Sequence, residues 1–111
     1  MKRASSRRST RLADQIAQEL AMALVQDVFD PRLELVTISG VALNTDLTVA
    51  QVLYTLSGDA ARLAEAAKAL DQAKGFLRTL LGKRLRLKSV PELRFARDTF
   101  LEDMVYGHPQ E

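Results

Sequence analysis

The chain has 111 residues, the size of a single domain, and 47% of them are hydrophobic, which is enough for a modest core. It contains no cysteine, which excludes disulfides, thiol nucleophiles and cysteine metal sites. The net charge is only +2, yet eleven of the sixteen basic residues fall in residues 1–11 and 74–88, which hold no acid. Such basic blocks are typical of surfaces that bind polyanions.

The first residues are polar and rich in serine and arginine, so we expect a flexible basic N-terminus over residues 1–8. No continuous apolar stretch follows it, which argues against a secretory signal, although an Arg- and Ser-rich start leaves a transit peptide as a minor alternative. The apolar runs are shorter than the ~18 residues that a membrane span requires.

A first helix is indicated by Leu12, Ile16 and Leu20 at helical spacing, with a cap at Ser9 or Thr10. The helix should end before Pro31 because proline cannot continue a helix.

Residues 33–44 are rich in β-branched residues and predict a strand, with a β-bulge at Gly40, where the alternation changes phase. A second strand at residues 48–56 follows after a short turn, so the two strands should form an antiparallel hairpin. Helical spacing then continues to about residue 85, after a cap at Ser57 or Asp59.

A third strand is predicted at residues 90–97, and a short terminal helix capped by Asp98 or Thr99 should follow it. Three strands need cover on one face, so the fold class is α+β, a two-layer sandwich with helices on one face of a three-stranded sheet. We expect one domain over residues 9–104 and a loose C-terminal tail over 105–111.

No constellation of catalytic residues emerges. The sole histidine, His108, lies in the expected tail, where a general base would lack positioning. Gly-rich phosphate loops are absent, and the acids near "FDPRL" are too few to form a metal site. We therefore expect no enzymatic activity, no cofactor and no bound metal.

A glycine interrupts the second helical pattern at Gly75, and basic residues surround it. Interior glycine costs a helix roughly 1 kcal/mol relative to alanine, and it usually marks a kink, a cap or the close approach of another backbone. A missing side chain admits a phosphate backbone, and a new helix start would offer free amide N–H groups to anions. The alternative is that Gly75 only lets two helices pack and that the basic side chains form a solvated face.

The order of elements resembles a type II KH domain, in which a GxxG loop between two helices clamps a nucleic-acid backbone. Here "AKG", Ala73-Lys74-Gly75, stands in that place. With "GFLR" and "VPELRF", it resembles the ribosome-binding factor A family, in which an A-x-G kink replaces GxxG. "RLADQIAQEL", "DPRLELVTISGV", "DLTVAQVLYTL" and "PELRFARD" resemble the first helix and the three strands of this family, so the resemblance covers about residues 7–104.

The resemblance implies a KH type II-like order, helix-strand-strand-helix-kink-helix-strand, and a non-enzymatic assembly factor. Members bind the immature 30S ribosomal subunit and its 16S rRNA or precursor, and they assist late maturation, including processing of the 5′ end, above all in the cold. A cytoplasmic protein, monomeric when free and without a membrane partner, is implied as well. The RNA-facing candidates are Ala73, Lys74, Gly75, Arg78, Lys83, Arg84, Arg86 and Lys88, with Arg7, Arg8 and Arg11 at the start of the first helix. For Arg32 a structural role in its turn is as plausible as a contact with RNA.

Two other functions remain open at this point. A general KH-like RNA chaperone would bind free structured RNA as well as small subunits. A protein-interaction module would act through the exposed face or edge of the sheet.

Overall fold

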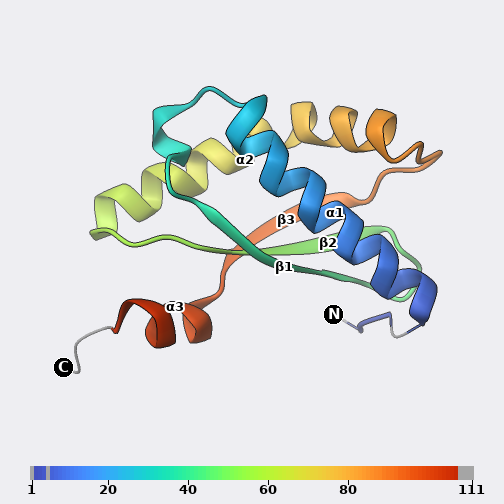
Figure 1. Cartoon of the computed structure of the whole chain (residues 1–111), viewed down its shortest axis with the longest axis horizontal. Helices are drawn as coiled ribbons and strands as arrows, with labels where there is room; N and C mark the ends of the chain where they lie inside the picture. The colour runs from blue at the N-terminus through green and yellow to red at the C-terminus, as the bar shows by residue number, and fades with distance from the viewer. Residues whose placement is uncertain (1, 5, 108–111) are drawn as a thin grey trace.

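The computed structural model describes residues 2–4 and 6–107, and it has three helices and a three-stranded sheet (Figure 1). The elements are α1 (Arg7–Gln26), the 3₁₀ turn η1 (Pro31–Leu33), β1 (Thr37–Leu43), β2 (Val49–Thr55), α2 (Ala60–Arg84), β3 (Glu92–Arg97) and α3 (Thr99–Tyr106). The predicted α+β class, with helices packed on a three-stranded sheet, is confirmed. No helix of the described residues has the length and apolar character needed to cross a membrane.

Helix α1 begins earlier than expected. Ser6, not Ser9 or Thr10, is its N-cap and accepts a hydrogen bond from the Ser9 amide at 3.1 Å. Ser9 is buried, and its hydroxyl donates to the Ser6 carbonyl. Serines three positions apart can each bond to the local backbone, so sequence alone does not decide which one caps the helix. The looseness of residues 1–8 and 105–111 stays a prediction, and residues 1, 5 and 108–111, His108 among them, lie outside the described residues.

The sheet has the order β1-β2-β3, with β1 antiparallel and β3 parallel to the central strand β2. The pairing of β1 with β2 shifts between Ile38 and Gly40, so the predicted bulge is confirmed. This shift lets residues on both sides of Gly40 present apolar side chains to the same core.

Helices α1 and α2 cover one face of the sheet. Alternate residues of β2, Ala50, Val52 and Tyr54, are buried beneath them, as strand periodicity predicts. The core also takes Ile16 and Leu20 from α1, Leu77 and Leu81 from α2, Leu43 from β1 and Leu93 from β3. This packing fixes the beginning of α1 and the end of α2 on one body.

Helix α2 runs without interruption through Gly75. The prediction of two separate helices joined at Gly75 was therefore wrong, although Figure 1 shows α2 changing direction near its middle. Leu70 and Leu77 are buried on either side of the glycine, and their packing offsets its cost within a cooperative helix. No new helix start with free amide groups forms at this position.

A buried carboxylate anchors α3 to the end of β2. Glu102 is 1% exposed, accepts a hydrogen bond from the Leu56 amide at 2.9 Å and pairs with Arg97 at 3.0 Å. Asp98 caps the helix, as expected, by accepting from the Leu101 amide. The helix is thus held mainly by polar contacts, and Phe100 on its outer side stays exposed.

Candidate nucleic-acid interface

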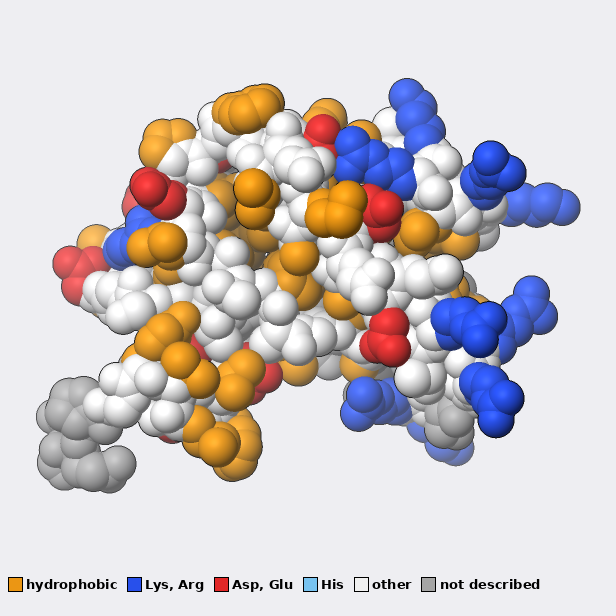
Figure 2. Space-filling model, in the orientation of Figure 1, with side chains coloured by type: hydrophobic (Ala, Val, Ile, Leu, Met, Phe, Trp, Pro, Cys, Tyr) orange, Lys and Arg blue, Asp and Glu red, His pale blue; other side chains and the backbone are white. Residues whose placement is uncertain are grey.

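The two basic segments of the sequence meet at one end of the molecule. Figure 2 shows lysine and arginine side chains gathered there, over the beginning of α1 and the end of α2. We call this surface the basic end. It comprises Lys2, Arg3, Arg7, Arg8, Arg11, Lys83, Arg86 and Lys88, all of which are exposed.

The side chains of the basic end are free to bind an anion. Within residues 2–4 and 6–107, none of the eight makes a side-chain hydrogen bond or an ion pair. A shallow depression of about 470 Å³ lies along α1 beside Arg7 and Arg11. Close, unpaired cations on a rigid body are suited to a polyanion because their charges need not first leave an internal partner.

Arg84, a predicted site residue, is used inside the fold. Its guanidinium donates to both carboxylate oxygens of Asp27, at 2.9 and 3.0 Å, and lies 3.7 Å from Glu19. Hydrogen bonding to Asp27 raises the pKa of Arg84 further above its usual value. Arg84 therefore joins α2 to α1 and is already neutralised by acids.

The residues around the glycine are also partly occupied. Lys74 forms an ion pair with Asp71 at 2.6 Å, one turn back on α2. Arg78 donates to the backbone carbonyls of Val90 and Pro91, at 2.9 and 3.2 Å, and so holds the segment before β3. Ala73 packs against the core. Both cations predicted around Gly75, Lys74 and Arg78, therefore already have partners within the fold.

Gly75 itself lies open on the surface of α2. A Cβ atom added there would meet no atom within 4 Å beyond its chain neighbours and the adjacent backbone of its own helix. The alternative that Gly75 exists to let two helices pack is therefore wrong. The open surface is compatible with the close approach of a nucleic-acid backbone, which stays a prediction.

Arg32 has a structural role. Its guanidinium binds the Asp30 carboxylate, with 2.7 Å from Nη2 to Oδ2, and also donates to Gln72 of α2. Hydrogen bonds from Arg32 hold the pKa of Asp30 below its usual value. This pair closes η1 and ties it to α2.

The described part of the chain holds no group of three or more histidine, aspartate or glutamate side chains placed to bind a metal ion. The site is therefore described by its fold and its charge. A three-stranded sheet covered by two helices, in the order found here, is the arrangement of a KH-like domain.

The family follows from comparison with known proteins. The family described as ribosome-binding factor A matches residues 8–107, and this chain belongs to that family. A ribosome-binding factor A from Chromohalobacter salexigens is 47% identical over 103 residues, covering 91% of this chain and 76% of its relative.

Solved structures agree. The crystal structure of ribosome-binding factor A from Thermus thermophilus has a TM-score of 0.72 and 30% identity, covering 80% of this chain and 93% of that one. A homology model of the Thermus thermophilus factor, fitted into a cryo-EM map of a 30S-RbfA complex, has a TM-score of 0.66 and 30% identity, covering 79% of this chain and 92% of that one.

Proposed function

We propose that this protein is an assembly factor that binds the small ribosomal subunit and contacts its 16S rRNA through the basic end. Membership of the ribosome-binding factor A family supports this proposal, and a relative has been fitted into a map of a 30S complex. The observation that carries the rRNA contact is that two distant basic segments converge on one end with unpaired side chains.

Recognition is electrostatic and depends on shape. Each cation that neutralises a phosphate releases condensed counterions, so affinity falls with salt in proportion to the number of contacts. Aromatic residues make up only 5% of the chain, too few for a platform on which bases stack. The protein therefore reads the folded backbone of the rRNA rather than its bases.

The physiological role we propose is that of a cytoplasmic, non-enzymatic factor that needs no cofactor. It binds the immature subunit, assists late maturation of 16S rRNA, including its 5′ end, and matters most in the cold. The KH-like order of elements and the absence of a catalytic constellation from the sequence support this role.

Sedimentation with purified small subunits over a series of salt concentrations tests the proposal. The variant Lys83→Ala/Lys88→Ala should lower the slope of log affinity against log salt by about one for each lost contact. Lys68→Ala is the matched control, because Lys68 is exposed on α2 and has no partner among the residues that the structure describes. It should leave the slope unchanged.

Three other outcomes would reject the proposal. An unchanged slope in the double variant would remove the basic end from the interface. Equal affinity for free structured RNA would indicate a general RNA chaperone. Association that resists both salt and nuclease would indicate a protein-interaction module.

A further inference from the structure

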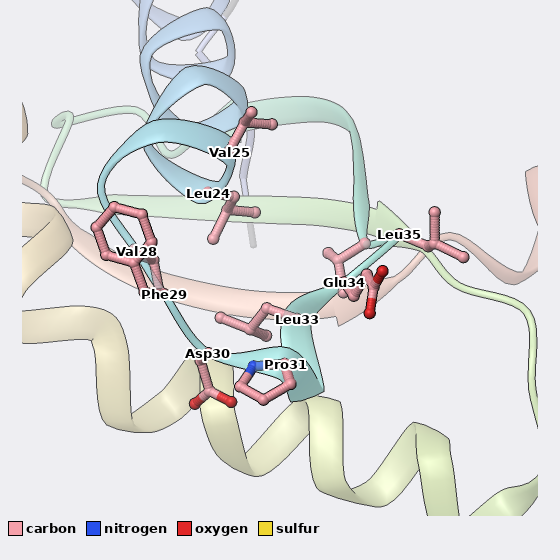
Figure 3. Close-up of a pocket in the computed structure, with 10 residues that line it drawn as sticks. Leu24, Val25, Val28, Phe29, Asp30, Pro31, Leu33, Glu34 and Leu35 are labelled. Carbon is pink, nitrogen blue, oxygen red and sulfur yellow. The ribbon is translucent and has the colours of Figure 1, made fainter.

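An apolar cavity of about 480 Å³ opens where α1 ends and the chain turns through η1 into β1 (Figure 3). Leu24 and Val28 of the α1 end and Leu33 and Val36 of the turn form its inner wall, and all four are at least half-buried. The volume falls within the range of about 300–1,000 Å³ that is usual for ligand sites. We call it the α1–η1 pocket.

Large apolar side chains stand exposed around its mouth. Val25 is 79% exposed, Phe29 88% and Leu35 79%. Single exposed apolar residues are ordinary, but three around one cavity form a contiguous apolar patch of the kind that marks an interaction site.

The charge around this pocket is the opposite of the charge at the basic end. Glu34 lines the pocket, and its exposed carboxylate has no partner among the residues described. Asp30 and Glu34 are the charged residues among those that line the pocket. Of the nearby cations, Arg32 pairs with Asp30, and Arg62 donates to the Glu34 carbonyl.

The pocket also lies far from the cations. Helix α1 has 20 residues and therefore separates the pocket from Arg7 and Arg8 by about 30 Å. The two cations near the pocket, Arg32 and Arg62, are hydrogen-bonded within the fold, and the Glu34 carboxylate would repel a phosphate backbone bound at the basic end.

We propose that the α1–η1 pocket binds a peptide segment of a small-subunit protein, with a large apolar side chain flanked by lysine or arginine. The apolar wall takes the side chain, while the Glu34 carboxylate attracts the flanking positive charge. This inference rests on the proposed function, since it places the protein on the subunit with its two ends against different components.

Site-specific photo-crosslinking on purified 30S subunits tests it. The full chain is made with p-benzoylphenylalanine in place of Phe29, and a second version carries it in place of Phe100. Both positions are exposed phenylalanines, at 88% and 77%, so the substitution is equally mild in both. A third version, with the crosslinker in place of Lys88, reports contact of the basic end with rRNA.

We expect position 29 to give a nuclease-resistant protein adduct and position 100 to give none. Mass spectrometry of the adduct should find a large apolar residue within three positions of a lysine or arginine. Glu34→Lys should lower the yield per bound protein at least threefold, and Asp14→Lys, the same charge change on an exposed part of α1, should leave it unchanged.

The inference would be overturned if position 29 gave RNA adducts or no adduct while position 88 gave RNA adducts. The proposed function would stand in that case. If Glu34→Lys does not lower the crosslinking yield at position 29, the proposed charge complementarity is wrong. Absence of adducts at all positions would reject the proposed function itself.

Discussion

Arg84 of α2 and Asp27 at the end of α1 are joined by two parallel hydrogen bonds, 2.9 Å from Nη1 to Oδ2 and 3.0 Å from Nη2 to Oδ1. Bidentate pairing fixes both the distance and the orientation of the two groups. The basic segment over residues 74–88 thus contains two kinds of cation. Arg84 is paired within the fold, whereas other cations of the segment belong to the exposed basic end. Arg86, two residues further on, belongs to the basic end.

The neighbours Arg84 and Arg86 should respond oppositely to truncation. Arg84→Ala removes these hydrogen bonds and leaves Asp27 and Glu19 without their cation, so the midpoint of urea unfolding should fall. Arg86→Ala should leave that midpoint unchanged and lower the salt slope of subunit binding by about one. Equal effects of the two variants on both measurements would contradict this assignment.

Gly75→Ala should stabilise the protein. Alanine is a better helix residue than glycine by roughly 1 kcal/mol, and the added methyl group meets open space. Gly82→Ala is the matched control on the same helix, because its Cβ would lie 3.1 Å from Val90 Cγ2 and its gain should be smaller or negative. Urea unfolding of both variants measures the difference.

A larger side chain at the same position tests the predicted approach of RNA. Gly75→Val should change the free energy of unfolding little, since valine is no worse in a helix than glycine. Subunit affinity should nevertheless fall, because the side chain fills the space that a phosphate backbone would use. Wild-type affinity in the folded Gly75→Val protein would rule out this contact.

Lys74 and Arg78 should contribute less to rRNA binding than the free cations do. Lys74→Ala/Arg78→Ala removes two charges, but each has an internal partner that already competes with phosphate. The reduction in salt slope should therefore be smaller than for Lys83→Ala/Lys88→Ala, and salt titration of both double variants compares them. A larger reduction would restore the glycine region as the main contact.

The buried carboxylate of Glu102 should be necessary for docking α3. Glu102→Ala leaves Arg97 and the Leu56 amide without their partner, a loss that costs about 3 kcal/mol for a buried pair. Glu102→Gln retains an acceptor for Leu56 and should cost less. Urea unfolding of both variants gives the free energies, and a loss below about 1 kcal/mol in Glu102→Ala would contradict the anchoring role.

Acid should weaken the turn at η1 through Asp30. Its pKa is lowered in the folded state, so its pairing with Arg32 stabilises the fold above the unfolded pKa of about 3.9 and is lost as the pH falls through the folded value. The difference in Tm between wild type and Asp30→Asn should be largest at about pH 6 and should decrease below about pH 4. The difference in Tm between wild type and Arg32→Gln should decrease over the same pH range.

Local patterns predicted the three strands, the bulge at Gly40 and the caps at Asp59 and Asp98, because each depends on neighbouring residues. The first strand was predicted from residue 33, but β1 begins at Thr37, because the chain first turns through η1. The continuity of α2 through Gly75 was not predictable from propensity, because burial of Leu70 and Leu77 decides it. Arg84 and Asp27 are 57 positions apart, and no local pattern pairs them. The ion pair of Lys74 with Asp71 is different, since its helical spacing was visible in the sequence.

The candidate site was likewise predictable from the sequence only in part. The distribution of charge along the sequence located the basic end, including Arg7, Arg8 and Arg11. It could not distinguish these exposed cations from Lys74 and Arg84, which form ion pairs within the fold. The apolar side chains of the α1–η1 pocket gave no signal, because an exposed Phe29 and a buried one read alike in a sequence.

The parallel pairing of β3 with β2 has a consequence for biosynthesis. The strand that completes the sheet leaves the ribosome after all of α2, so the β1–β2 hairpin is synthesised long before its partner. Until β3 arrives, β2 presents an unpaired edge of the kind that invites pairing with other chains. Slow translation between residues 56 and 92 should therefore favour aggregation of the nascent chain, and codon choice in that interval becomes a determinant of yield.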